Sequence, residues 1–160
     1  MNIRVGHGID IHQLKDNIPL ILAGVKIESD VGIEGHSDGD IIIHAIVDAL
    51  LGALNKGDIG TFFPSDNLKW KDTNSSVFLM HTIKLMNKEN YDISNIDINI
   101  ILEKPYIGSY ILSMKQNLSE LMNIDYNNIS IKATTADKLG FIGTEQGIMS
   151  TATLLLIKNS

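Results

Sequence analysis

The sequence predicts an α+β fold, in which helices pack on one face of a mixed β-sheet. Apolar residues recur at helical spacing in three segments, roughly residues 37–55, 75–90 and 107–122. Shorter strand-like segments precede, separate and follow these helices, which gives the order ββ-α-α-β-α-β-β. With 160 residues and 44% hydrophobic content, the chain suits one domain spanning residues 1–160.

The strand predictions rest on alternation and on turn residues. Residues 3–11 are predicted as a strand, and residues 18–27 as a hairpin or a bulged strand broken at Gly24. Residues 96–102 alternate isoleucine or leucine with polar side chains, which is typical of a strand with one wet face. The last strand, residues 147–158, is apolar on both faces near its end, so we expect it to be central or buried in an interface.

Composition excludes several classes of site and partner. The chain has no cysteine, so a metal site can use only nitrogen and oxygen ligands. A net charge of -6 without a basic stripe predicts no nucleic-acid partner. No segment has the length and hydrophobicity of a signal peptide or a membrane span, so we expect no membrane association and a cytoplasmic protein, or a plastid-type organelle if a targeting peptide was removed.

A candidate metal site lies in the first strand. Asp10 and His12 are two residues apart, so a strand places both side chains on one face. His44 is the best third ligand, with Asp40 as a rival on the same helical stripe and Asp48, one turn on, as a residue that could orient His44. The spacing alone leaves open a solvated strand face and a helix histidine with a structural role.

Two further segments could bind an anion. Gly35–Asp40 precedes the first helix, where Ser37 and Asp40 have the spacing of a capping box, and its backbone N–H groups, His36 and Ser37 could donate to a phosphate. A helix that is simply well capped explains the same pattern. In residues 132–143 the phosphate-type donors and a possible second metal ligand are Thr134, Thr135, Lys138 and Asp137.

Taken together, these segments resemble the 2-C-methyl-D-erythritol 2,4-cyclodiphosphate synthase family. The stretches "GHGIDIHQL", "GHSDGDIIIHAIVDALLGALNKGDIGTFFP" and "IKATTADKLGFIG" match it in order and spacing, and the resemblance covers the whole chain. It implies conversion of 4-diphosphocytidyl-2-C-methyl-D-erythritol 2-phosphate to the 2,4-cyclodiphosphate with release of CMP, a step of the non-mevalonate isoprenoid pathway. It also implies a homotrimer with its sheets around a central axis and active sites between subunits.

The resemblance assigns roles to individual residues. It implies zinc, or another divalent ion, on Asp10, His12 and His44, with a substrate phosphate in the fourth position. His36 and Thr135 would stabilise the phosphates in the transition state. The residues implied to bind the methylerythritol part are Ser37, Asp58, Ile59, Gly60, Phe63, Pro64, Ser65, Asp66 and Asn67; those for cytidine are Leu102, Glu103, Lys104, Pro105, Tyr106, Ile107 and Gly108; and those for the diphosphate and its surroundings are Thr134, Ala136, Phe141 and Thr144.

The chain departs from the family pattern at four positions. Asp137 replaces a glutamate that binds Mg²⁺ or Mn²⁺ between the substrate phosphates, and Tyr106 replaces a lysine common beside the cytidine pocket. Ile9 and Thr144 replace an aromatic residue and an arginine that in some members help to line an isoprenoid-diphosphate cavity on the trimer axis. Two alternatives to the synthase remain: a metal-dependent phosphohydrolase with the same ligands, and a non-catalytic trimer with a structural metal.

Overall fold

A five-stranded mixed sheet runs through the molecule in the strand order β4-β1-β7-β5-β6. Parallel pairing joins β5 and β6, and the other neighbouring strands are antiparallel. The computed structural model describes residues 2–35 and 37–159. The five strands are β1 (Ile3–Asp16), β4 (Val31–Ile33), β5 (Tyr91–Ile101), β6 (Ile129–Thr134) and β7 (Gly147–Lys158).

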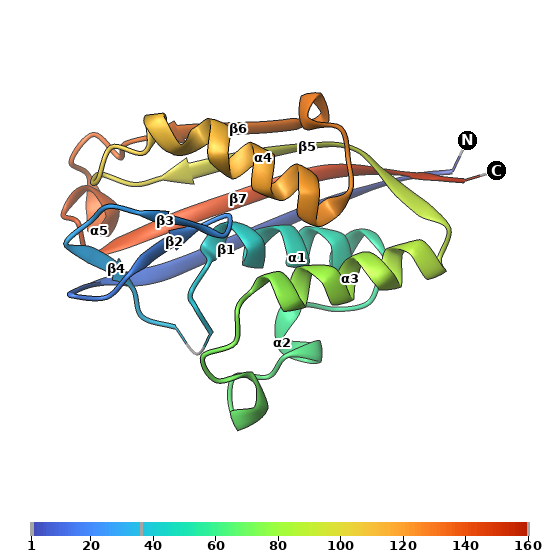
Figure 1. Cartoon of the computed structure of the whole chain (residues 1–160), viewed down its shortest axis with the longest axis horizontal. Coiled ribbons are helices and arrows are strands. Elements are labelled where there is room, and N and C mark those ends of the chain that lie inside the picture. The colour runs from blue at the N-terminus through green and yellow to red at the C-terminus, as the bar shows by residue number, and fades with distance from the viewer. Residues whose placement is uncertain (1, 36, 160) are drawn as a thin grey trace.

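Helices cover one face of this sheet, which confirms the predicted α+β arrangement (Figure 1). They are α1 (Ile41–Ala53), α3 (Ser76–Lys88) and α4 (Ile111–Met122). The shorter elements are α2 (Ile59–Phe62), α5 (Gly140–Gly143) and the 3₁₀ turns η1 (Leu68–Trp70), η2 (Gly108–Tyr110) and η3 (Tyr126–Asn128). Among the described residues, no helix combines the length and apolar character needed to cross a membrane.

Two of the strand predictions are confirmed in detail. The segment around Gly24 is a hairpin of β2 (Leu20–Leu22) and β3 (Val25–Ile27), with Ala23 and Gly24 both at positive φ, as a tight right-twisted hairpin turn requires. The last strand, β7, lies at the centre of the sheet. The first strand is longer than predicted because β1 continues past β7 and pairs with β4 through Leu14–Asp16.

The backbone of α1 lies unusually close to β1. A Cβ atom on Gly6 would lie 1.9 Å from the Ala49 carbonyl oxygen, and one on Gly8 would lie 2.0 Å from that of Ala45. Only glycine in the strand, facing alanine in the helix, permits this approach. The side chains that follow these glycines on the same face of β1 therefore point at the N-terminal half of α1.

The start of α1 differs from the prediction in one respect. Asp40, and not Ser37, is the N-cap, since its Oδ1 accepts the N–H of Ile43 at 3.2 Å and the preceding Gly39 has a φ of 70° that no helix contains. The Asp40 carboxylate is completely buried and also accepts the N–H groups of Ala23 (2.9 Å) and Gly24. Asp40 thus joins α1 to the hairpin, and the prediction that it could be a metal ligand is wrong.

The face of the sheet opposite the helices is uncovered in the single chain. Odd-numbered residues of β1 point to this face. Five apolar side chains are exposed there, four from β1 and one from β7: Ile3, Val5, Ile9, Ile11 and Ile157. An apolar sheet face of this kind is typical of a surface that another chain covers.

Replacement of Asp40 by alanine should strongly destabilise the fold. It leaves buried backbone N–H groups of the hairpin and the helix without an acceptor, so we expect a loss of about 3 kcal/mol or more in the free energy of unfolding. Urea denaturation measures this loss. Asp58→Ala is the matched control, because Asp58 caps α2 in the same way but is exposed. An equally small effect of both substitutions would contradict the structural role of Asp40.

The same carboxylate should give the stability a pH dependence. Burial raises the pKa of Asp40 from 3.8 to about 6, against the opposing effect of its backbone hydrogen bonds. The folded state then binds the proton more tightly than the unfolded state, so the contribution of Asp40 to stability falls as the pH rises from about 4 to 6 and is constant above. Asp40→Asn should remove this component from a series of urea denaturations at different pH.

Candidate metal centre and nucleotide pocket

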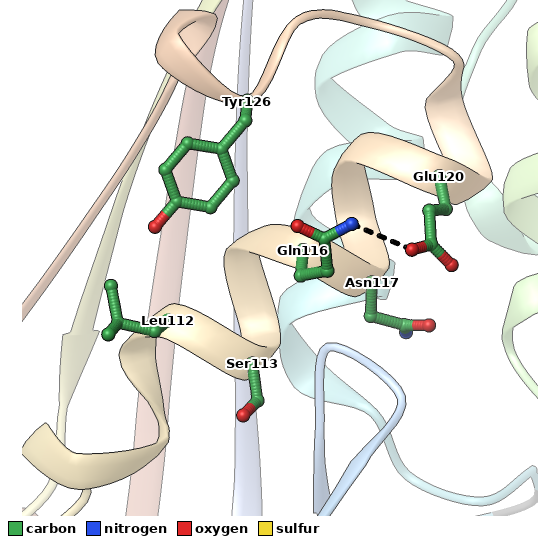
Figure 2. Close-up of a pocket in the computed structure, with 6 residues that line it drawn as sticks. All are labelled: Leu112, Ser113, Gln116, Asn117, Glu120 and Tyr126. Atoms are coloured by element: carbon green, nitrogen blue, oxygen red, sulfur yellow. Dashed lines mark hydrogen bonds between the residues drawn. The ribbon is translucent and has the colours of Figure 1, made fainter.

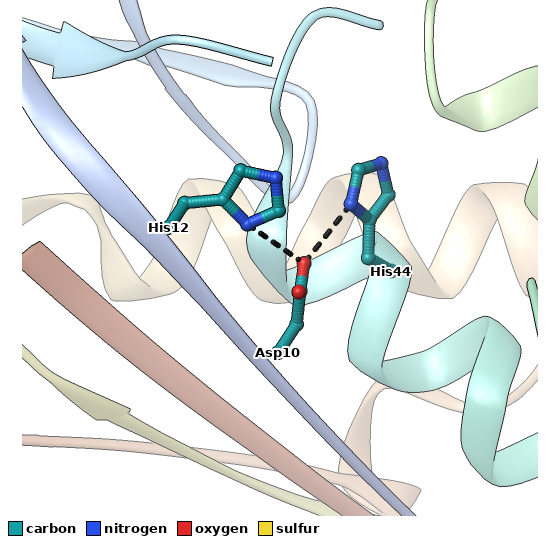
Figure 3. Close-up of side chains that lie close together, drawn as sticks. All are labelled: Asp10, His12 and His44. Atoms are coloured by element: carbon teal, nitrogen blue, oxygen red, sulfur yellow. Dashed lines mark hydrogen bonds and ion pairs between the residues drawn. The ribbon is translucent and has the colours of Figure 1, made fainter. Parts of the chain in front are cut away.

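Asp10, His12 and His44 converge on one point between β1 and α1 (Figure 3). The Nδ1 atoms of His12 and His44 lie 3.1 and 3.0 Å from Asp10 Oδ2. One potential ligand atom from each side chain lies within 4.8 Å of the others. The close packing of α1 on β1 produces this convergence, because it brings His44 level with the two strand residues. The sequence prediction that these three side chains meet is confirmed.

The electrostatics of the cluster favour a bound cation. Each of the three side chains is less than a quarter exposed. Burial alone would raise the pKa of Asp10, but the hydrogen bonds and charges of His12 and His44 outweigh it and lower the pKa to about 2. Asp10 is therefore an anion at neutral pH, and Ile11 N–H fixes its second oxygen at 3.0 Å. His12 Nδ1 is buried, and no described group satisfies its hydrogen-bond geometry.

The donor set fits zinc. Two imidazole nitrogens and one carboxylate oxygen are the ligands that a catalytic Zn²⁺ takes, with its fourth position left to water or substrate. A divalent ion would also bind the buried His12 Nδ1, whose 3.1 Å contact with Asp10 Oδ2 lacks hydrogen-bond geometry. Evidence other than residue spacing thus supports a cation site, because the buried His12 Nδ1 and the largely buried Asp10 carboxylate face the same small volume.

Asp48 does not orient His44, contrary to the prediction. Its Oδ1 accepts the N–H of Ile59, the first residue of α2, at 2.7 Å. That N–H is one of the groups a helix start leaves unpaired, and Asp48 is the nearby acceptor. Burial raises the pKa of Asp48, partly offset by this bond. The Nε2 atom of His44 instead lies 3.0 Å from Ser75 Oγ and 3.1 Å from Ser37 Oγ.

A second site lies at the carboxyl ends of the parallel strands β5 and β6. The predicted cytidine segment, residues 102–108, lines a pocket of about 420 Å³ together with Thr134 and Thr135. Ile111 and Ala133 complete the lining and were not predicted. Strand alternation places Ala133 without indicating its exposure to a pocket, and Ile111 begins a helix whose periodicity alone indicates core packing.

The loop that contains Thr134, Thr135, Ala136 and Asp137 is held by hydrogen bonds, one of them to Glu103 of the pocket lining. Glu103 Oε2 accepts the N–H of Ala136 at 3.2 Å, and Thr135 Oγ1 accepts that of Asp137 at 3.3 Å. Asp137 and Lys138 both have positive φ, at 52° and 62°. The Asp137 side chain is exposed and does not belong to the Asp10 cluster. Its predicted role at a second metal ion stays a prediction.

In the segment after α1, residues 58–67, one buried aromatic side chain packs in the core and the neighbouring polar side chains are exposed. Asp58 caps α2 by accepting the N–H and hydroxyl of Thr61 at 2.9 and 2.8 Å, which lowers its pKa. Phe63 is buried, stacks on Phe78 with ring centroids 4.4 Å apart and meets Trp70 edge-on at 5.1 Å. Its side chain therefore holds the segment, while the polar side chains of Ser65, Asp66 and Asn67 are exposed.

Phe141 and Thr144 line neither site, Tyr106 is a largely exposed residue of the pocket lining, and one predicted residue lies outside the described chain. Phe141 covers Gly147, where a Cβ would meet its ring at 2.8 Å, and Thr144 Oγ1 donates to the Gly140 carbonyl at 3.0 Å. Tyr106 is 84% exposed at the mouth of the cytidine pocket. His36, predicted to stabilise the phosphates, lies outside the described residues.

The shallow groove along α4, at about 540 Å³, is larger than the pocket at residues 102–108, but its described lining contains no cluster of possible metal ligands (Figure 2). Its lining is Leu112, Ser113, Gln116, Asn117, Glu120 and Tyr126. The carboxylate of Glu120 accepts a hydrogen bond from Gln116 at 2.7 Å, and Asn117 donates to the Ala23 carbonyl at 2.6 Å. These groups stabilise the helix and the hairpin.

Comparisons with known proteins identify the family of the chain. A family model described as the YgbB family matches residues 3–157. The 2-C-methyl-D-erythritol 2,4-cyclodiphosphate synthase of Azobacteroides pseudotrichonymphae genomovar. CFP2 is 47% identical over 156 residues, which cover 98% of this chain and 93% of that protein.

Solved structures show the same fold. An IspF of Plasmodium falciparum, solved as a CDP complex, has a TM-score of 0.89 and 44% identity, covering 99% of this chain and 98% of that one. The bifunctional IspDF from Campylobacter jejuni has a TM-score of 0.95 and 35% identity over 99% of this chain, which spans only 43% of that protein. From residues 3–157 and from relatives matched along nearly its whole length, this chain belongs to the YgbB family, together with the 2-C-methyl-D-erythritol 2,4-cyclodiphosphate synthases.

Proposed function

We propose that this chain is a 2-C-methyl-D-erythritol 2,4-cyclodiphosphate synthase. In the reaction, an oxygen of the substrate's 2-phosphate attacks the β-phosphorus of its own diphosphate. The bond from that phosphorus to the bridging oxygen breaks, and CMP leaves with the bonding electrons. The observation that supports this function most strongly is the convergence of Asp10, His12 and His44 in a chain that also builds a nucleotide-sized pocket.

The reaction needs positioning and charge neutralisation rather than a covalent protein group. Its nucleophile, a phosphate oxygen, is already ionised at neutral pH, so no strong general base is required. Two anionic groups must approach each other on a protein of net charge -6. Asp10, His12 and His44 would hold zinc, which when bound supplies Lewis-acid neutralisation of a phosphate oxygen.

Other residues of the chain would position the two ends of the substrate. Thr134 and Thr135 line the pocket next to the cytidine segment, and the Thr135 hydroxyl, which accepts the Asp137 N–H, keeps its own proton for donation to the diphosphate. The segment 102–108 would surround the cytosine and ribose. We place Asp137 near a second ion, Mg²⁺ or Mn²⁺, and His36 at the phosphates, as the family resemblance implies.

We further propose a homotrimer with active sites between subunits. The uncovered sheet face carries exposed isoleucine and valine side chains that a neighbouring chain would bury. The cytidine pocket is lined by the ends of β5 and β6 and includes none of the three clustered ligands. In a trimer the ligands of one subunit and the pocket of the next can complete one site.

Loss of a metal ligand should abolish metal binding and turnover but not the fold. We expect purified Asp10→Ala and His44→Ala proteins to contain less than a tenth of the zinc of the wild type, because each variant removes one of three ligands. Elemental analysis measures the zinc content. His81→Ala is the matched control, since His81 is exposed on α3 and should leave zinc content unchanged. Full zinc occupancy in the ligand variants would contradict the assignment.

Product analysis separates the synthase from the alternatives. With 4-diphosphocytidyl-2-C-methyl-D-erythritol 2-phosphate and Mg²⁺, the wild type should release CMP in equal amount to a cyclic diphosphate, detected by ³¹P NMR. Release of inorganic phosphate would indicate a phosphohydrolase with the same metal site. If the protein binds zinc and leaves the substrate unchanged, the metal has a structural role and the proposed function is wrong.

A charge on the uncovered sheet face should dissociate the trimer. Val5 is 68% exposed in the single chain, so Val5→Asp would cost a monomer little, but in a trimer it would bury a carboxylate. Light scattering should give three times the 17.6 kDa chain mass for the wild type and a smaller species for Val5→Asp. Leu112→Asp is the matched control, because Leu112 is 69% exposed on α4, in the open groove of Figure 2. A trimer that tolerates Val5→Asp would contradict the proposed interface.

A further inference from the structure

The second ring nitrogen of His44 faces a buried chain of polar groups. While Nδ1 points to Asp10, Nε2 lies 3.0 Å from the hydroxyl of Ser75. Ser75 is completely buried just before α3, 31 residues away in the sequence. Ser37 Oγ lies beside it, 3.1 Å from the same nitrogen and 3.3 Å from Ser75 Oγ. The ring is thus contacted at both nitrogens.

The direction of the hydrogen bonds follows from the groups beyond Ser75. The hydroxyl of Ser75 donates to Asp38 Oδ1, and its backbone N–H donates to Asp38 Oδ2 at 3.1 Å. Asp38 Oδ1 also accepts the N–H of Asp40 at 3.2 Å, so the carboxylate acts only as an acceptor. The single hydroxyl proton of Ser75 is used by Asp38. Towards His44, Ser75 Oγ can therefore only accept. A proton on Nε2 fits this contact, and the Ser37 hydroxyl can then donate to Ser75 Oγ.

We infer that Asp38 and Ser75 are positioning residues that keep a proton on His44 Nε2 and so leave Nδ1 free to bind the metal. This inference rests on the proposed metal centre. Without this pair, Asp10 Oδ2, which lies 3.0 Å from Nδ1, would favour the proton on Nδ1. A proton on Nδ1 would block coordination of a metal ion by that nitrogen. The Ser75–Asp38 pair opposes that shift because the Ser75 hydroxyl, whose proton is held by Asp38, can accept a hydrogen bond from Nε2–H but cannot donate one to Nε2.

The pair also fixes where the ring lies. The Asp38 backbone N–H donates to the Thr73 carbonyl at 3.1 Å, so backbone and side chain of Asp38 both bind the segment that leads into α3. His44 lies between this segment and β1, with its ring centroid 6.2 Å from that of Phe78 on α3. Hydrogen-bond partners of a metal-binding histidine that set its tautomer and orientation typically change metal affinity by about 10- to 100-fold when removed.

Two variants test the inference by their affinity for Zn²⁺ and by the tautomer of His44, without any measurement of activity. In Ser75→Ala and Asp38→Ala we expect the Kd for Zn²⁺, measured by chelator competition on the whole protein, to rise about 10- to 100-fold. In the metal-free variants, ¹⁵N NMR of the histidine rings, at a pH where His44 is neutral, should show the proton moving from Nε2 to Nδ1. Ser75→Thr, which keeps the hydroxyl, should restore both the affinity and the tautomer.

Ser76→Ala is the matched control. Ser76 is the next residue in the chain, and its hydroxyl makes no hydrogen bond within the described parts of the molecule, so this variant should bind zinc like the wild type. Circular dichroism confirms that each variant is folded. Unchanged zinc affinity together with an unchanged tautomer in folded Ser75→Ala would overturn the inference. Absence of zinc binding by the wild type would instead refute the metal centre itself, so the two failures are distinguishable.

Discussion

The contact between α1 and β1 is the constraint on which the site depends. Gly6 and Gly8 allow the helix backbone at Ala45 and Ala49 to lie against the strand, where any side chain would collide with a carbonyl oxygen. Because the helix lies this close, His44 reaches the two strand residues that follow the glycines on the same face. A larger residue at either glycine would collide with the backbone of α1 and would have to move the helix that carries His44.

Asp38 and Asp40, two acidic residues in the loop before α1, stabilise different parts of the fold because they accept hydrogen bonds from different donors. Asp40 is buried against the hairpin turn and gathers backbone N–H groups of Ala23, Gly24 and Ile43. Asp38, two residues earlier, faces the other way and holds Ser75. One turn of chain thus connects the hairpin, α1 and the start of α3, and the His44 ring lies among these elements. The position of the ring is thus set by hydrogen bonds that do not involve a metal ion.

A protein of net charge -6 can bind a polyanionic substrate if a bound cation neutralises the negative charge at the site itself. Asp10 stays ionised in a buried position, since His12 and His44 lower its pKa, and this is the condition for holding a divalent cation. The pocket proposed for cytidine lies at the ends of β5 and β6 and is lined mainly by neutral groups, Thr134 and Thr135 among them. The uncovered apolar face of the sheet explains how the proposed trimer would bring a ligand cluster and a pocket together.

Periodicity was sufficient for the fold class and for placing Asp10 and His12 on one face, because strand alternation is a local property of the backbone. For β7 it left two alternatives, a central strand or one buried in an interface, and the structure shows the central position. Residue spacing also made His44 the best third ligand, with Asp40 as a rival; the family resemblance, carried by long specific stretches, favoured His44 and added the cytidine segment. Local spacing failed where the partner was distant: Asp40 and Asp48 share the helical stripe of His44, yet backbone donors from the hairpin and from α2 bind them instead. Asp38 and Ser75 are 37 residues apart, and no pattern links them. Only the packing of α3 beside α1 brings their polar groups to the second nitrogen of His44, because the direction of a buried hydrogen bond depends on every donor and acceptor around it.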